Sequence, residues 1–276
     1  MTYECIEFDV QDRVATIAFN MPKYGNALTI KGVQETFDAL HRAEAREEVG
    51  AIVLTGRGQA FCSGFNLKEI PISEIRAAGE IRDDAIDAHF RLAAMWWHQV
   101  LHLITRIRKP VLAAVNGVAV GSGLGMTLCA DMAVCTENAR FLPAWHTIGL
   151  ANDATTSYSL AKIVGFRRAL EWILTNRTVA AREALAMNLV NRVYDEASFP
   201  GHVASIARQL AAGPTHLQGM AKEGFHGGWR RPIEEATEFE IQNVMTSLSH
   251  PYFAESLRKF LTGERKSSDP QVTLPD

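Results

Sequence analysis

Residues 109–131 read KPVLAAVNGVAVGSGLGMTLCAD, an apolar run followed by a glycine-rich turn and a stretch of small residues. The run at 111–115 is typical of a buried β-strand. Glycine follows it at Gly117, Gly121, Gly123 and Gly125. Glycines let the backbone turn tightly and approach a ligand closely. A helix that begins near Ser122 would leave its first N–H groups free to stabilise an oxyanion, assisted by the helix dipole. The same pattern also fits a helix packed tightly on a sheet.

A second stretch, GQAFCSGFNLKE at 58–69, follows a predicted strand at 51–55. Together with 109–131, it resembles the paired signature of the crotonase, or enoyl-CoA hydratase/isomerase, superfamily. In that superfamily the two segments supply the two backbone N–H groups of an oxyanion hole, which binds the carbonyl of a coenzyme A thioester. The resemblance places these groups at Phe65 and Ser122.

The resemblance covers nearly the whole chain, from NAL at 26–28 to the segment at 165–193. It implies an α/β protein with a crotonase-like ββα spiral core at residues 1–200, which binds the acyl-CoA. Residues 201–276 are expected to form a C-terminal helical segment and tail, through which superfamily members assemble as trimers or dimers of trimers. The alternation of strand and helix patterns supports a sheet with helical crossovers.

Hydrophobic periodicity predicts the order of the elements. The expected strands lie at 5–10, 14–20, 51–55, 111–115, 132–136 and 140–142. One helix is expected after Thr29 and a long helix from about 85 to before Lys109. Further helices are expected at 167–174, 180–186, 203–210, 217–225, 233–248 and 251–261. Asn188 can adopt the left-handed conformation that ends a helix. The mixed composition of 71–79 indicates a mobile surface segment close to the site.

Within the superfamily, the likeness is greatest to the 4-chlorobenzoyl-CoA dehalogenases. It rests on WWH at 96–98, AWHTIG at 144–149, ND at 152–153 and SYSL at 157–160. The reaction that this resemblance implies is hydrolysis of a 4-halobenzoyl-CoA, such as 4-chlorobenzoyl-CoA, to 4-hydroxybenzoyl-CoA through an aryl-aspartate ester. No metal or redox cofactor is expected, and coenzyme A is part of the substrate.

The resemblance also assigns each chemical step to a residue. Asp153 would attack the ring carbon that carries the halogen, while the N–H groups of Phe65 and Ser122 stabilise negative charge on the thioester carbonyl. His98 would then activate the water that hydrolyses the ester. The indole N–H of Trp145 would orient the Asp153 carboxylate.

Further residues are expected to bind the substrate, because aromatic rings can hold a benzoyl group in a dry pocket and basic side chains can bind phosphates. The expected substrate-binding residues are Phe90, Trp97, Gly121, Gly123, Lys68 and Arg265. Lys68 and Arg265 would bind the phosphates of coenzyme A, Arg265 from another subunit. The chain departs from the superfamily pattern at Gly25, where a basic residue is expected, and from the dehalogenases at Ser122, where they carry glycine.

Hydratases of the superfamily use two glutamates to add water across a double bond. In register these fall at Gly125 and Trp145, and neither residue can transfer a proton, so hydratase chemistry is not expected. Two alternatives stay open: an enoyl- or dienoyl-CoA isomerase that uses Asp153 for proton transfer, and a non-catalytic binding protein. Simpler local roles also fit, since Asp153 could be the N-cap of the following helix and His98 could be a packed residue on an apolar helix.

Composition argues against nucleic-acid binding, a metal or disulfide framework, and membrane association. The chain has 276 residues, of which 47% are hydrophobic, and a net charge of −3, so no basic surface for nucleic acid is expected. Its four cysteines lack the spacing of a zinc site or a disulfide framework, and we expect them to be buried, reduced thiols. The sequence shows no leader pattern and no run of about 18 apolar residues, so we expect a cytoplasmic protein without a membrane partner.

Overall fold

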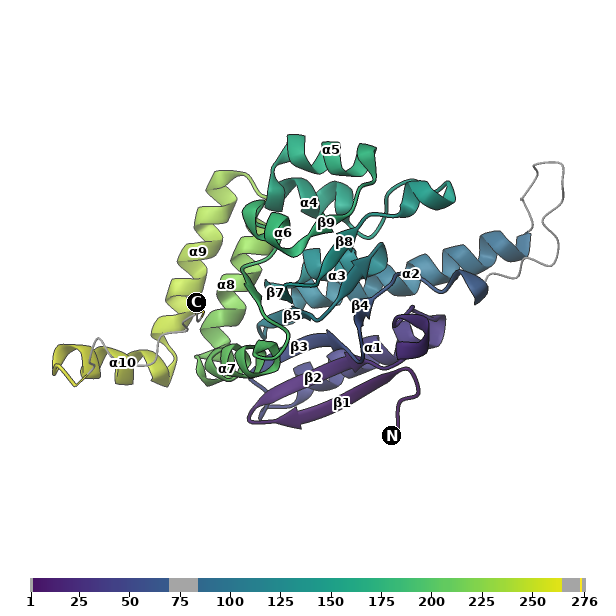
Figure 1. Cartoon of the computed structure of the whole chain (residues 1–276). Helices are drawn as coiled ribbons and strands as arrows, with labels where there is room; N and C mark the ends of the chain where they lie inside the picture. Colours follow the sequence, from purple (N-terminus) through teal and green to yellow (C-terminus); the bar gives the residue numbers. More distant parts are fainter. Residues whose placement is uncertain (1, 70–83, 265–273, 275–276) are drawn as a thin grey trace, which may run out of the picture.

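The structure is a computed structural model, in which residues 2–69, 84–264 and 274 are described. The predicted surface segment at 71–79 and the predicted phosphate-binding residue Arg265 lie outside these residues. Figure 1 shows strands at the centre of the molecule with helices around them, and the N-terminal hairpin of β1 and β2 at one side.

A strand–strand–helix unit repeats along the first part of the chain. Its members are β1 (Ile6–Gln11), β2 (Val14–Phe19) and α1 (Ile30–Ala45); β3 (Ala51–Gly56), β4 (Ala60–Cys62) and α2 (Asp84–Arg106); β5 (Val111–Val115), β6 (Val118–Val120) and α3 (Ser122–Cys129); and β7 (Met132–Thr136), β8 (Arg140–Leu142) and α4 (Thr156–Val164). From the second unit on, the first strand joins one sheet and the second strand joins another, so the chain advances as a spiral. The predicted strands are confirmed, whereas β4 and β6, each three residues long, have no clear sequence signal.

The larger sheet has the strand order β1-β2-β3-β5-β7-β10, with β10 at Arg192–Tyr194. β1 pairs with β2 in an antiparallel hairpin, and the sheet continues in parallel from β2 to β10. Successive side chains alternate between its faces: Ile52 lies in one apolar core and Val53 in another, which α7 (Phe199–Ala212) covers. Because both faces are buried, β5 reads as an uninterrupted apolar run.

The smaller sheet has the strand order β4-β6-β8-β9, with β9 at Val179–Ala180. β4, β6 and β8 run parallel to one another. A predicted site residue follows within three positions of the end of each strand: Phe65 after β4, Ser122 after β6 and Trp145 after β8. Since the carboxyl ends of parallel strands lie at one edge of a sheet, the fold gathers these three residues at that edge.

A buried lysine fixes the end of α2, the helix that carries His98. Nζ of Lys222 donates to the carbonyl of Ile104 (2.7 Å) in the last turn of α2 and pairs with the carboxylate of Asp131 (2.8 Å). Lys109 acts in the same way at the end of α1, where its ammonium group donates to two backbone carbonyls. Burial lowers the pKa of both lysines, and the hydrogen bonds compensate for their loss of water.

The C-terminal part of the chain is helical, as predicted. Its helices are α5 (Phe166–Thr175), α6 (Ala181–Ala186), α7, α8 (Thr215–Gly228), α9 (Ile233–Leu248) and α10 (Pro251–Leu261). α8 packs on α2, α9 packs on α8, and α10 extends away from the sheets (Figure 1). The predicted division between residues 1–200 and 201–276 falls inside α7 and stays a prediction. Across the described part of the chain, no helix has the length and apolar character needed to cross a bilayer.

Candidate active site

The side chains of His98 and Asp153 meet, although the two residues are 55 positions apart in the sequence. His98 lies on α2, Asp153 lies shortly before α4, and Nε2 of the imidazole is 2.8 Å from Oδ1 of the carboxylate. Their side chains are 39% and 45% exposed, so a substrate and water can reach both. A neutral imidazole can donate from Nε2 to the carboxylate and keep a lone pair on Nδ1. The pair therefore places a possible nucleophile beside a possible base.

Asp153 is not the N-cap of α4, so the capping interpretation is wrong for its side chain. The helix begins at Thr156, and its N-cap residue Thr155 is left-handed and makes no side-chain capping bond within the described chain. The backbone carbonyl of Asp153 accepts hydrogen bonds from the N–H (3.1 Å) and the hydroxyl (2.7 Å) of Thr156. The carboxylate is directed to His98 instead, which leaves it available for chemistry.

Two consecutive left-handed residues present Asp153. Ala154 and Thr155 have φ angles of 54° and 62°, a conformation that costs a residue with a Cβ on the order of 1–2 kcal/mol. Ala154 is fully buried against α3, where a Cβ added at Gly125 would lie 2.5 Å from the Ala154 Cβ. Oγ1 of Thr155 also lies 3.3 Å from Sγ of Cys129, on the same helix. α3 thus supports the strained turn, and it can do so because residue 125 has no side chain.

The glycine-rich segment forms the turn and helix that the sequence predicts. α3 begins at Ser122, directly after Gly121, whose φ is 51°. The first backbone hydrogen bond along the helix runs from the N–H of Gly125 to the carbonyl of Gly121 (3.0 Å). The N–H groups of Ser122 and Gly123 come before that bond and so have no acceptor inside the helix, as at the start of any α-helix. Ser122 is only 8% exposed, so an anion bound at its N–H would be little screened by water.

The second predicted oxyanion donor, Phe65, adjoins the start of α3. Leu28 and Phe65 form an isolated parallel β-bridge. The N–H of Leu28 donates to the Gly64 carbonyl, and the N–H of Asn66 donates to the Leu28 carbonyl, both at 2.8 Å. The N–H of Phe65 therefore points away from Leu28. A Cβ added at Gly64 would lie 3.2 Å from the carbonyl oxygen of Val120, so the two backbone segments are in contact.

Trp145, which belongs to a third segment of the chain, also lies beside the N-terminus of α3. It is the first residue of a short 3-10 helix, Trp145–Ile148, and is 8% exposed. A Cβ added at Gly121 would lie 4.0 Å from Cε2 of the indole, so the ring lies beside the N-terminus of α3. Among the described residues, no hydrogen bond joins Trp145 to Asp153. The orienting role of Trp145 stays a prediction.

The predicted substrate-binding side chains are less closely gathered. Trp97 is 1% exposed and lies in the apolar core, and its indole N–H is buried without a partner among the described residues. Phe90 is half-buried on α2, about two turns before His98. Lys68 is exposed in the 3-10 helix Leu67–Glu69. No contact between Phe90 or Lys68 and the His98–Asp153 pair occurs in the part of the chain that is described, and their roles stay predictions.

Burial shifts the pKa of two further side chains, His102 beside the pair and Cys62 beside the start of α3. The ring of His102, one turn after His98, stacks at 6.4 Å from it, and burial lowers the pKa of His102, with the nearby charge of Arg106 adding to the effect. His102 is therefore expected to be neutral near pH 7. Burial raises the pKa of Cys62 to about 12, so its thiol is not a nucleophile at neutral pH. The described residues contain no group of three or more His, Cys, Asp or Glu that could hold a metal ion.

Sequence patterns alone do not reveal the residues that hold Asp153 and Trp145 in place. The left-handed pair Ala154–Thr155 contains no glycine or asparagine that would signal it. Asn176 binds the turn that carries Trp145, and its one signal is an asparagine at the end of a predicted helix. Both features depend on contacts between segments far apart in the chain.

Comparison with known proteins identifies the family. The family model described as enoyl-CoA hydratase/isomerase matches residues 9–268. The chain is 51% identical to 4-chlorobenzoyl coenzyme A dehalogenase-2 of Arthrobacter sp, over 98% of this chain and 95% of the relative. It is 32% identical to a probable enoyl-CoA hydratase of Rhodobacter capsulatus, over 95% of this chain and 96% of the relative.

Solved structures agree with these matches. The crystal structure of a putative enoyl-CoA hydratase from Streptomyces coelicolor superposes with a TM-score of 0.85 at 28% identity, covering 96% of this chain and 94% of that one. The predicted α/β class with a crotonase-like core is thereby confirmed. The chain belongs to the enoyl-CoA hydratase/isomerase family.

Proposed function

We propose that this chain catalyses the hydrolytic dehalogenation of 4-chlorobenzoyl-CoA, with 4-hydroxybenzoyl-CoA and chloride as products. The observation that carries the proposal is the 2.8 Å contact between His98 and Asp153. The packing of Ala154 on Gly125 ties this pair to α3, which begins at Ser122. The 51% identity to relatives described as 4-chlorobenzoyl coenzyme A dehalogenases supports the same activity.

In the first step, an electron pair of the Asp153 carboxylate forms a C–O bond to the ring carbon that carries chlorine. The ring electrons move onto the thioester oxygen, which would accept hydrogen bonds from the N–H groups of Phe65 and Ser122. The charge then returns to the ring, the C–Cl bond breaks, and chloride leaves with its electron pair. The product of this step is an aryl ester of Asp153.

The second step hydrolyses the ester. Because Asp153 has lost its negative charge in the ester, it no longer holds the imidazole of His98. His98 accepts a proton from water, whose oxygen attacks the acyl carbon of the ester. The tetrahedral intermediate expels the 4-hydroxybenzoyl-CoA phenolate, which takes up the proton held by His98. The Asp153 carboxyl group then loses its proton to solvent, so that the carboxylate and the neutral imidazole are both restored. A neutral His102 next to His98 would not oppose this proton transfer by charge repulsion.

Hydratase chemistry would need carboxylates that this site has no place for. At residue 125, even a Cβ would meet Ala154 at 2.5 Å, so a glutamate cannot enter without moving the Asp153 turn. At the position of the second hydratase glutamate, this chain has the indole of Trp145. An isomerase would lack the same second carboxylate and depend on Asp153 alone, and for this reason we favour dehalogenation.

We also propose that the protein assembles as a homotrimer or a dimer of trimers. Several apolar side chains that are more than half exposed lie on the last two described helices, among them Ile241, Val244 and Met245 on α9, and Phe260 and Leu261 on α10. An apolar surface of this kind marks a site of association, and here it suits a second copy of the chain. A CoA-phosphate contact by Arg265 of a neighbouring subunit, a contact by Lys68, and a cytoplasmic location remain predictions.

Three substrates separate the candidate functions. The purified protein would be incubated with 4-chlorobenzoyl-CoA, crotonyl-CoA and a dienoyl-CoA, while chloride release and absorbance changes are followed. Stoichiometric chloride from the first compound alone supports the proposal. Turnover of crotonyl-CoA or the dienoyl-CoA without chloride release would refute it in favour of a hydratase or an isomerase, and no turnover of any of the three would favour a binding protein.

A further inference from the structure

Asn176 ends α5 and binds the turn that carries Trp145. Its backbone is left-handed, with a φ of 48°, and its N–H donates to the carbonyl of Trp172 (2.9 Å). Its side chain reaches a segment much earlier in the sequence. The N–H of Ala144 donates to Oδ1 (2.9 Å), and Nδ2 donates to Oγ1 of Thr147 (2.8 Å). The two bonds lie on either side of Trp145 in the sequence.

The turn at Trp145 has backbone hydrogen bonds of its own, from the Thr147 N–H to the Ala144 carbonyl and from the Leu150 N–H to the Trp145 carbonyl, both 3.0 Å. Ala144, the residue before Trp145, has a φ of 65°, which is costly for a residue with a Cβ. The 3-10 helix Trp145–Ile148 is only four residues long, and Trp145 is its one buried residue. Short 3-10 segments have poor hydrogen-bond geometry. Side-chain contacts from outside the turn therefore add to its backbone hydrogen bonds and to the core packing of the indole.

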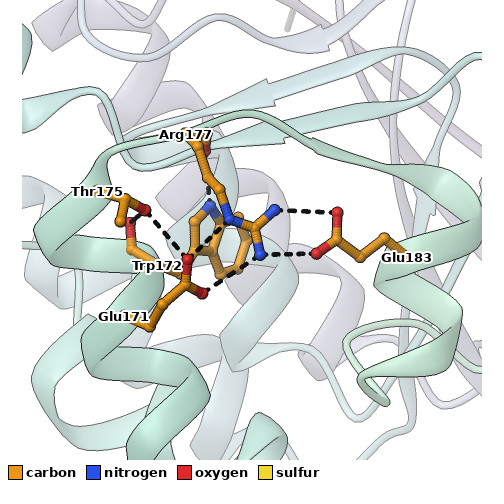
Figure 2. Close-up of polar contacts among 5 residues, drawn as sticks. All are labelled: Glu171, Trp172, Thr175, Arg177 and Glu183. Atoms are coloured by element: carbon orange, nitrogen blue, oxygen red, sulfur yellow. Dashed lines mark hydrogen bonds and ion pairs between the residues drawn. The ribbon is translucent and has the colours of Figure 1, made fainter.

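Asn176 provides such contacts from a rigid position. Figure 2 shows the guanidinium of its neighbour Arg177 between Glu171, on α5, and Glu183, on α6. The nitrogens of Arg177 lie 3.0 and 3.3 Å from the Glu171 carboxylate and 3.0 and 2.7 Å from the Glu183 carboxylate. The carbonyl of Arg177 also accepts a hydrogen bond from Nε1 of Trp172 (2.8 Å). Contacts to two helices thus fix the backbone that carries the Asn176 side chain.

We infer that Asn176 is a positioning residue that holds Trp145 beside the N-terminus of α3; its effect on catalysis rests on the proposed function. The indole lies next to Gly121, directly before the N–H of Ser122 that would bind the thioester oxygen. Release of the turn would move the indole relative to that donor. Since the reacting groups need placement to within about 1 Å, turnover should fall more than binding.

Substitutions at Asn176 separate its backbone role at the end of α5 from its side-chain hydrogen bonds to Ala144 and Thr147. Asn176→Gly keeps a left-handed helix end, which glycine adopts readily, but removes both side-chain bonds. Asn176→Asp keeps the acceptor for the Ala144 N–H and can accept a hydrogen bond from the Thr147 hydroxyl, so it should restore the clamp. Asn188→Gly is the matched control, because Asn188 is an exposed left-handed asparagine (φ 63°) after α6, with no side-chain hydrogen bond among the described residues.

The variants would be compared by kcat and KM with 4-chlorobenzoyl-CoA and by fluorine NMR of protein labelled with 5-fluorotryptophan. Trp145→Phe identifies the Trp145 resonance. We expect Asn176→Gly to lower kcat by about ten- to hundredfold, with a smaller change in KM, and to shift or broaden that resonance. Asn176→Asp should stay within about threefold of wild type, and Asn188→Gly should match wild type in both measurements.

An unshifted Trp145 resonance with wild-type kcat in Asn176→Gly would overturn the inference, and so would equal losses in Asn188→Gly. If wild type fails to release chloride, the proposed function falls, but the resonance still tests the clamp. If Asn176→Gly does not fold, Thr147→Val removes one of the two bonds and should give a smaller shift of the same resonance. No shift in that variant would also overturn the inference.

Discussion

Gly125→Ala should slow dehalogenation strongly although it adds a single methyl group. The new Cβ would lie 2.5 Å from the Cβ of Ala154 and 2.8 Å from its carbonyl oxygen. Carbon atoms in contact need about 3.5–4.0 Å, so the turn that presents Asp153 must retreat by about 1 Å. A misplacement of that size at a reacting group costs about a hundredfold in rate. We therefore expect kcat for chloride release to fall by roughly that factor.

The same substitution should leave the protein folded. Overpacking of this kind costs about 1–3 kcal/mol, while alanine in place of glycine inside a helix returns up to about 1 kcal/mol. The net loss of unfolding free energy is then about 0–3 kcal/mol, which urea denaturation can measure. Activity and stability losses are thus separable.

Ala154→Gly is the compensating change for this test. It removes the closest methyl contact, and glycine favours the φ of 54° that Ala154 adopts. The double variant keeps the 2.8 Å contact with the carbonyl oxygen and an ordinary 3.4 Å contact with the Cα, so we expect kcat to recover by about tenfold over Gly125→Ala. Wild-type kcat in Gly125→Ala, or no recovery in the double variant, would refute the view that Ala154 on α3 sets the position of Asp153.

Three further predictions follow from the site and the core. His98→Gln should release one equivalent of chloride and then stall as an aryl-enzyme, because the proposed role of His98 begins after halide has left. Rapid-quench mass analysis would detect the adduct, and normal multiple turnover would remove His98 from the mechanism. Ser122→Gly should keep activity, whereas Ser122→Pro removes the N–H donor and should cost about a hundredfold or more; full activity in a folded proline variant would move the oxyanion hole elsewhere. Burial raises the pKa of the thiols of Cys62, Cys129 and Cys135 to about 12, 11 and 12 from 9.0, so the unfolded chain loses these protons first and the folded state loses stability as pH rises above 9. The free energy of unfolding should fall by about 1.4 kcal/mol per pH unit for each thiol, and urea titrations with Cys→Ala variants would show no change in this slope if the prediction is wrong.

The elements of the fold are largely predictable because their signals are local. Thr29 caps α1 as expected, since its hydroxyl accepts a hydrogen bond from the N–H of Gly32 (2.9 Å). Asn188 is left-handed, as its position after a helix predicts. The apolar run of β5 reflects burial on both faces of a parallel sheet.

The features that long-range contacts decide are not predictable from such patterns. Asp153 matches an N-cap in the sequence, but Ala154 and Thr155 interpose two left-handed residues before α4 begins. The cost of that conformation is offset by packing on Gly125, which no local pattern reports. The meeting of His98 with Asp153 was implied by a family resemblance and not by periodicity, because a contact over 55 residues leaves no local trace.

The central claim is that the Asp153 carboxylate, and not water, attacks the aromatic ring. A single turnover of 4-chlorobenzoyl-CoA by excess enzyme in oxygen-18 water tests it directly. The account predicts 4-hydroxybenzoyl-CoA with an unlabelled hydroxyl oxygen, because that atom comes from Asp153, and label in the Asp153 carboxylate afterwards. A labelled hydroxyl oxygen in that first turnover, with no label in Asp153, would mean that water attacks the ring and would contradict the account.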